Sequence, residues 1–214
     1  TTAQAGILEN TPRFDYSGGA TCPSLLLEPS RTNLVKYSEY FDSTLWLKGA
    51  NIEKVSSNNL SPSGELTAYK YKSINITSST FLRFSTLVAD NTDYTFSCYI
   101  RSNNPSALTT GKAMQLQINN GGQTTSISST LITNEWQRFD ITATSGTSSI
   151  IYAYVGVDFD VDAEIEFWGA QLEQGAYATS YIPTYSVSAT RAGDTCSKTD
   201  ASEEIGQTEG VVFV

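Results

Sequence analysis

Three segments of the chain alternate apolar and polar side chains, and this alternation constrains the fold more than any other feature. Residues 94–101, 113–119 and 150–159 each place apolar side chains at every second position. Successive side chains of a β-strand point to opposite faces of a sheet, whereas a helical face repeats every 3.6 residues. The three segments are therefore predicted to be strands with one face in a core and one face in solvent.

Most of the remaining chain also consists of short apolar or alternating runs. These runs lie near residues 25–28, 50–56, 66–73, 81–88, 137–142 and 164–172. They are separated by clusters of Gly, Asn, Asp and Ser, which favour turns. Short strands spaced in this way are typical of an all-β sandwich. We therefore predict a β-sandwich of two antiparallel sheets.

The last of these runs is the most apolar, and its alternation predicts two faces. Phe167 and Gly169 would lie on one face, and Trp168, Ala170 and Leu172 on the other. Tryptophan side chains are more often packed in a core than exposed as a ligand platform. We therefore expect Trp168 to belong to the core together with Ala170 and Leu172.

Both ends of the sandwich segment resemble a known family. The sequence FWGAQLEQGAYATSYIPT at 167–184, with SATRAGD at 188–194, is similar to the closing segment of carbohydrate-binding-module-like domains in tailed-phage virion proteins. The sequence LLLEPSRTNLVKYSEYFDSTLW at 25–46 resembles the opening segment of the same domains. The resemblance implies a jelly-roll domain of a head fibre, tail fibre or spike, located on the virion surface and acting extracellularly. Its implied partners are host surface polysaccharides and other virion proteins.

Composition divides the chain into three parts. Residues 1–24 contain scattered Pro and Gly without a steady period and are interpreted as an extended lead-in or linker. Residues 25–185 contain the predicted strands and are assigned to the sandwich. Residues 186–214 are rich in Ser, Thr, Gly and acidic residues, and are interpreted as a linker followed by the start of another domain at 210–214.

Charge and the lack of histidine exclude several function classes. The net charge of the 214-residue chain is −9, which disfavours nucleic acid as a ligand. The apolar runs are too short to span a bilayer, which argues against membrane insertion. Without histidine no Ser-His or Cys-His pair can form. The carboxylate pairs Glu164–Glu166 and Glu203–Glu204 do not mark a cleft, so we expect a protein that is not an enzyme.

The polar faces of the three alternating strands share one set of side-chain types. If the strands are neighbours, tyrosines, glutamines and an arginine gather on one outer surface. These candidate glycan-binding residues are Tyr99, Arg101, Gln115, Gln117, Tyr152 and Tyr154. A pyranose packs its C–H face on an aromatic ring, while its hydroxyls hydrogen-bond with amides and guanidinium groups. The surface is therefore predicted to bind a sugar.

Other interpretations of the same residues stay open. An ordinary solvated sheet face uses the same residue types, because tyrosine favours strands. The loop after the closing strand carries Tyr177 and Tyr181, and loops at the end of a sandwich often serve recognition, so this loop is the alternative site. In a functional alternative, the domain is purely structural and spaces, decorates or trimerises the virion appendage. Its aromatic face would then pack against another copy in a homo-oligomer.

An acidic alternation near the closing strand is a candidate calcium site. Asp158, Asp160 and Asp162 supply the hard oxygen ligands that Ca²⁺ prefers. The segment lacks the glycine turn of an EF-hand loop, and a solvated turn is the alternative interpretation. No other cofactor is indicated.

The three cysteines are assigned different environments. Cys98 lies in an apolar row and is expected to be a buried thiol. Cys22 and Cys196 flank the sandwich, whose ends often lie near each other, and they either pair in a disulfide or stay reduced.

Overall fold

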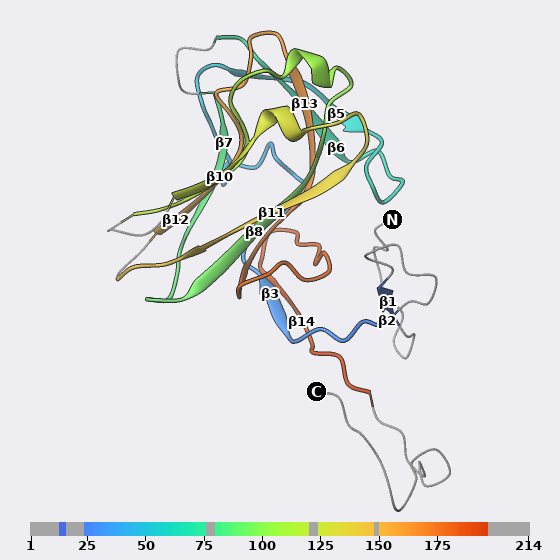
Figure 1. Ribbon diagram of the computed structural model, residues 1–214, viewed down its shortest axis with the longest axis vertical. Coiled ribbons are helices and arrows are strands. Elements are labelled where there is room, and N and C mark those ends of the chain that lie inside the picture. The colour runs from blue at the N-terminus through green and yellow to red at the C-terminus, as the bar shows by residue number, and fades with distance from the viewer. Residues whose placement is uncertain (1–12, 16–23, 76–79, 120–123, 148–149, 197–214) are drawn as a thin grey trace, which may run out of the picture.

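The described part of the chain folds into two five-stranded antiparallel sheets that pack face to face (Figure 1). The computed structural model describes residues 13–15, 24–75, 80–119, 124–147 and 150–196. Besides strands, these residues contain short 3-10 turns such as Pro105–Ala107 and Ser129–Leu131. No helix among them is long and apolar enough to cross a membrane. The all-β sandwich predicted from the alternation is confirmed.

Each sheet contains strands that are far apart in the sequence. The first sheet has, in order, β10 (Thr124–Ser128), β9 (Lys112–Ile118), β12 (Ile150–Val157), β7 (Leu82–Leu87) and β4 (Leu47–Lys48). The second sheet has, in order, β11 (Gln137–Thr144), β8 (Asp93–Arg101), β13 (Glu164–Gln174), β6 (Ala68–Ser73) and β5 (Ile52–Asn59). Two small ladders pair β1 (Phe14–Asp15) with β2 (Ser24–Leu25), and β3 (Arg31–Asn33) with β14 (Ala189–Arg191).

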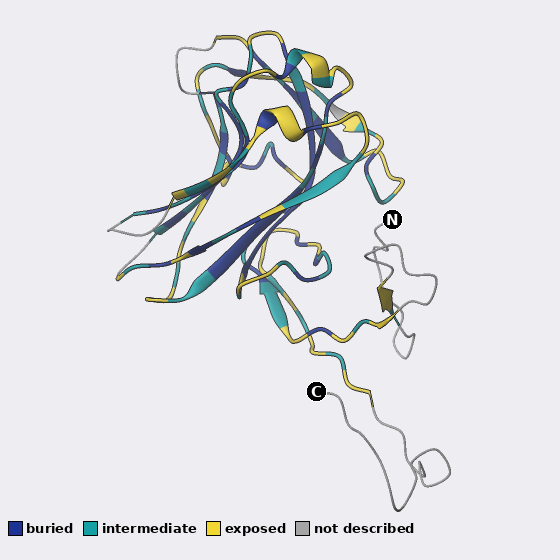
Figure 2. Ribbon diagram, viewed as in Figure 1, coloured by how far each residue is buried: buried dark blue, intermediate teal, exposed yellow. Residues whose placement is uncertain are grey.

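The core lies between the two sheets, where their apolar rows meet (Figure 2). The three alternating strands contribute Phe96, Cys98, Ile100, Met114, Leu116, Ile118, Ile151, Ala153 and Val155. The segment after β3 adds Phe41 and Trp46, whose ring centroids are 4.8 Å apart. The inward faces predicted for the three strands, and the buried thiol predicted at Cys98, are confirmed.

Strand β13 does not alternate along its whole length, because a β-bulge follows Trp168. Gly169 in the bulge has a φ of +65°, a conformation that disfavours residues with a side chain. The extra residue of a bulge reverses the alternation, so Ala170 and Leu172 join the core together with Phe167. Trp168 is instead buried outside the main core cluster. The prediction that Trp168 shares a face with Ala170 and Leu172 is therefore wrong.

The segments at the two ends of the domain pair with each other beside β13. The β3–β14 ladder is visible below the sandwich in Figure 1, and the Leu34 N–H donates to the Leu172 carbonyl at 2.8 Å. Residues 189–191, interpreted from composition as part of a linker, therefore form a strand that pairs within the domain. Local composition predicted a loop because the short strand has a polar sequence and depends on a distant partner.

A buried carboxylate joins these terminal segments. Glu28 forms ion pairs with Arg13 and Arg191 and accepts a hydrogen bond of 2.7 Å from the Ser180 N–H. Burial alone would raise the pKa of Glu28, but the hydrogen bonds from Arg13, Ser180 and Arg191 outweigh it and lower the pKa from 4.5 to about 2. Glu28 is therefore ionised at neutral pH and connects three segments that are distant in sequence.

Some expectations concern residues outside the described part of the chain. These are most of the lead-in, which includes Cys22, and residues 197–214, which include Glu203, Glu204 and the expected start of another domain at 210–214. The two alternatives for Cys22 and Cys196, a disulfide or reduced thiols, accordingly both stay open.

Candidate functional site

The outer surface of the first sheet brings together four of the six candidate residues. Strands β9 and β12 are neighbours, with Gln117 opposite Tyr152 and Gln115 opposite Tyr154. All four side chains are partly exposed and alternate with residues of the core row. The Tyr154 hydroxyl donates to Oε1 of Gln117 at 3.2 Å. The faces predicted for these two strands are confirmed.

Arg83 on β7 belongs to the same surface, although we did not expect it from the sequence. Arg83 lies opposite Tyr154 in the ladder, and its guanidinium is 4.8 Å from the ring centroid of Tyr152. Phe81 packs edge-on against Tyr154, with centroids 5.5 Å apart. The sequence signal that could have identified Arg83 was its position between two apolar residues in an alternating run. We define the outer-sheet patch as Arg83, Gln115, Gln117, Tyr152 and Tyr154.

The patch consists of two rows that cross three strands. One row is Gln115–Tyr154–Arg83, and the other is Gln117–Tyr152–Ser85. Neighbouring strands are about 4.8 Å apart, so each row extends about 10 Å. Each tyrosine therefore has a glutamine on one side and, on the other, Arg83 or Ser85.

Tyr99 and Arg101 do not belong to this patch. Strand β8 lies in the second sheet, and its polar side chains point away from the shared core on the other side of the sandwich. The condition for a surface of all six residues, that the three alternating strands are neighbours, is therefore not met. Alternation determines which face of a strand is buried, but it does not determine which strands pair with it.

Tyr99 is partly exposed and packs against the loop after β13. Its ring centroid lies 5.4 Å from that of Trp168 and 6.5 Å from that of Tyr181. The Arg138 guanidinium lies 5.6 Å from the Tyr99 centroid. Burial raises the pKa of Tyr99, while the nearby Arg138 partly opposes this shift. These contacts attach the loop after β13 to the second sheet.

Arg101 is held by a buried carboxylate. Its Nε donates to Oε2 of Glu166 at 2.7 Å, and its guanidinium lies 4.7 Å from the ring of Trp136. Lys70 lies 3.4 Å from carboxylate oxygens of both Glu164 and Glu166. Glu166 is 2% exposed and is thus enclosed by cations rather than presented in a cleft.

The two tyrosines of the alternative loop site point in different directions. The Tyr181 hydroxyl donates to Glu39 Oε1 at 3.0 Å and lies in hydrogen-bond contact with Ser38 Oγ at 2.6 Å. Burial and the Glu39 charge raise the pKa of Tyr181 well above its usual value. Tyr177 is 52% exposed and lies 5.5 Å from the Arg31 guanidinium. Of these two tyrosines, only Tyr177 therefore offers an exposed ring.

The three aspartates of the acidic alternation, Asp158, Asp160 and Asp162, contact different segments of the chain. Asp160 accepts from the backbone N–H groups of Thr109 and Thr110 at 2.6 and 2.8 Å. Burial alone would raise the pKa of Asp160, but these hydrogen bonds outweigh it and lower the pKa. Asp162 lies 3.7 Å from Lys72 Nζ. In the described ranges, no group of three His, Cys, Asp or Glu residues is placed so that it could hold a metal ion.

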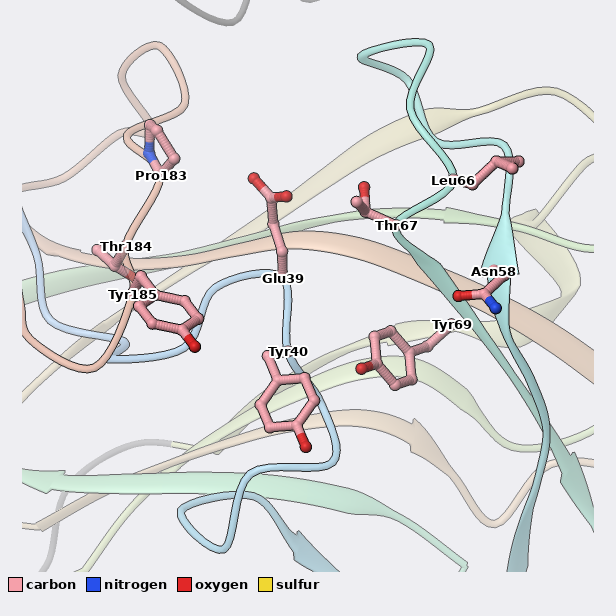
Figure 3. Close-up of a pocket in the computed structure, with 9 residues that line it drawn as sticks. All are labelled: Glu39, Tyr40, Asn58, Leu66, Thr67, Tyr69, Pro183, Thr184 and Tyr185. Atoms are coloured by element: carbon pink, nitrogen blue, oxygen red, sulfur yellow. The ribbon is translucent and has the colours of Figure 1, made fainter.

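A pocket of about 490 Å³ lies where three segments meet at the second sheet (Figure 3). The segment after β3, strands β5 and β6 with their connection, and the loop after β13 supply its lining. The lining residues are Glu39, Tyr40, Asn58, Leu66, Thr67, Tyr69, Pro183, Thr184 and Tyr185. Sequence reasoning missed this pocket, because Tyr40 and Tyr185 lie in irregular segments whose proximity no local pattern reveals.

Comparisons with known proteins give similar folds among solved structures. No family model and no curated protein matches the chain. The CBM22-1 xylan-binding domain of Paenibacillus barcinonensis Xyn10C is 13% identical, with a TM-score of 0.47 over 69% of this chain and 94% of that domain. The second N-terminal cellulose-binding domain of Cellulomonas fimi β-1,4-glucanase C is 12% identical, with a TM-score of 0.47 over 70% of this chain and 97% of that domain.

Other matches involve longer chains. The enzymatically active domain of Bacteriophage CBA120 tailspike protein 4 is 7% identical, with a TM-score of 0.44 over 67% of this chain and 21% of that one. In the first three matched structures, the alignment covers 21–28% of the partner's length, so this chain spans about a quarter of those proteins.

Proposed function

We propose that this chain is a non-catalytic carbohydrate-binding domain whose ligand site is the outer-sheet patch. The observation that carries the proposal is the pair of rows in which Tyr152 and Tyr154 each lie beside a glutamine, with the Arg83 guanidinium close to both rings. The rings offer apolar surface to the C–H face of a sugar, and the amides and guanidinium offer hydrogen bonds to its hydroxyls. An open sheet surface suits a polysaccharide chain, which does not need an enclosed cavity.

Binding at one such site is expected to be weak. Each ring contact contributes about 1 kcal/mol beyond the buried area. A single site would then have a Kd near 1 mM, about 4 kcal/mol of binding free energy. Many copies on one particle would raise the apparent affinity by several orders of magnitude.

The proposal includes a location on a phage virion, in a head fibre, tail fibre or spike. Its support is the resemblance of residues 25–46 and 167–194 to the ends of such domains. The ligand would then be a host surface polysaccharide, and the neighbours would be other virion proteins. Incubating host cells with this chain should reduce adsorption of the virion that carries it; unchanged adsorption at saturating chain would contradict this location.

The binding experiment compares variants of the patch on arrayed glycans. The glycans that bind on the array are then tested as soluble oligosaccharides. Tyr152→Ala and Tyr154→Ala should each weaken binding about tenfold, while the melting temperature changes by only a few degrees. Tyr177→Ala removes an exposed ring outside the patch and should bind as the parent does. Loss of folding in the patch variants would instead identify both rings as packing residues.

A different outcome would favour the structural alternative. If no surface polysaccharide binds and the chain forms a dimer or trimer that Tyr152→Ala dissociates, the patch is an oligomer interface. Light scattering of the parent and variant at equal concentration distinguishes the two functions.

A further inference from the structure

The pocket in Figure 3 differs chemically from the outer-sheet patch, because it combines three tyrosine rings with a single carboxylate. We propose that this pocket is a second binding site, which takes an organic ammonium group. The group would be carried either by an amino sugar or by a choline headgroup. The inference concerns a separate site and does not depend on sugar binding by the patch.

The rings form a corner with a third ring beside it. The centroids of Tyr40 and Tyr69 are 6.3 Å apart, and their planes meet at 75°. Tyr185 is 79% exposed and lines the same pocket. Tyr37 packs edge-on against both Tyr40 and Tyr185, at 5.9 and 5.6 Å, and so positions the two outer rings. Several ring faces around one space attract a cation through their negative π-surfaces.

The lining of the pocket carries negative charge only. Glu39 is the only charged residue among those that line it. Oε1 of Glu39 accepts from the Tyr181 hydroxyl at 3.0 Å, which fixes the carboxylate in orientation. Within the described part of the chain Glu39 has no ion pair, whereas the nearby Asp42 is paired with Lys54 at 2.6 Å. A partly buried carboxylate without a counter-ion favours a positively charged ligand.

Other ligand classes fit this lining less well. An anion would meet Glu39 with no lysine or arginine in the lining to compensate. A neutral sugar would stack on the rings and leave the carboxylate without a counter-charge. Burial and the charge of Asp42 raise the pKa of Tyr69 to about 12, so its ring stays neutral and does not add a second negative charge. An ammonium group uses both the rings and the carboxylate.

The test compares each cation with a neutral compound of the same shape. Choline is titrated against 3,3-dimethyl-1-butanol, and glucosamine against glucose, with the full chain and detection by NMR shift changes. We expect at least one ammonium compound to bind about tenfold more tightly than its neutral counterpart. Binding of choline alone identifies a quaternary headgroup as the ligand, and binding of glucosamine identifies an amino sugar. Equal affinity for cation and counterpart, or binding of neither cation, overturns the proposal.

Two variants assign the binding to the pocket. Tyr185→Ala removes a ring that is mostly exposed, and Glu39→Gln removes the charge while its amide oxygen can still accept from Tyr181. Each should weaken binding of the ammonium compound at least fivefold. Tyr177→Ala, which removes an exposed ring from the same loop but outside the lining, should leave it unchanged. An unchanged affinity in Tyr185→Ala and Glu39→Gln would show that the cation binds elsewhere.

Each of the two proposed sites can be disproved without the other. Tyr152→Ala tests the patch with sugars, and Tyr185→Ala tests the pocket with ammonium compounds. Loss of one kind of binding with retention of the other therefore identifies which of the two proposals is wrong.

Discussion

The guanidinium of Arg83 lies nearer to the ring of Tyr152 than to the tyrosine directly opposite it. The distances to the ring centroids are 4.8 Å for Tyr152 and 5.9 Å for Tyr154, although the ladder pairs Arg83 with Tyr154. The arginine thus leans diagonally across the sheet and places its planar group beside a ring that faces solvent. This arrangement supplies hydrogen-bond donors next to the surface on which a sugar would stack.

Replacing this arginine should weaken sugar binding without unfolding the domain. Arg83→Met keeps an unbranched apolar side chain but removes the donors, and we expect the Kd for the best oligosaccharide to rise about tenfold. Arg83→Lys keeps the charge without the planar group and should lie between the parent and Arg83→Met. Calorimetric titration measures both, and equal affinities for all three proteins would show that Arg83 only packs against the tyrosines.

The sequence predicted the faces of individual strands better than their neighbours. A period of two residues is a local property of the backbone, so the buried row around Cys98 and the exposed row around Tyr152 could both be predicted. Sheet membership depends on pairing between distant segments, which is why Tyr99 was assigned to the wrong surface. The pocket that contains Tyr40 and Tyr185 depends on two irregular segments and had no periodic signal at all.

The bulge in β13 leads to a stability prediction at Gly169. Gly169→Ala should lower the free energy of unfolding by about 2 kcal/mol, because a side chain is strained at a φ of +65°. The added Cβ would also lie 3.2 Å from the Tyr99 ring and 3.4 Å from the Tyr181 ring. Urea unfolding of the parent and the variant measures this difference.

Gly64→Ala is the matched control for the bulge. Gly64 also has a positive φ, +88°, but a Cβ there meets no atom within 4 Å. Its loss of stability should therefore reflect the backbone term alone, about 1 kcal/mol. If the two variants lose equal stability, the rings of Tyr99 and Tyr181 do not restrict the bulge.

Glu28 should make the domain sensitive to acid. The pKa of Glu28 is lowered from 4.5 to about 2 in the folded chain, so folding favours its ionised form. Its contribution to stability is fully present above about pH 5 and is lost as the pH falls through 4.5 toward 2. Glu28→Gln should lower the free energy of unfolding at pH 7 by roughly 1–3 kcal/mol, because Arg13 and Arg191 lose their shared partner.

Urea unfolding of both proteins across this pH range provides the check. The difference between the parent and Glu28→Gln should be constant from about pH 7 to pH 5 and should shrink at lower pH. A difference that stays constant down to about pH 3 would show that the Glu28 carboxylate does not titrate with a lowered pKa. Loss of stability in the variant that is confined to low pH would contradict the ion pairs themselves.

The thiol of Cys98 should be unreactive until the domain unfolds. Burial raises the pKa of Cys98 to about 12, and the charge of Arg138 only partly opposes this. The thiolate is the reactive form, and at about pH 8 only roughly one thiol in ten thousand would be ionised even if a reagent could reach it.

Cys98 is fully buried, so its alkylation by iodoacetamide should proceed at the rate of global unfolding. Cys196 is exposed and, with a reductant present, supplies a fast internal reference in the same digest. Mass spectrometry of the two peptides over time measures both rates, and labelling of Cys98 as fast as Cys196 under native conditions would mean that the core between β8 and β13 opens locally.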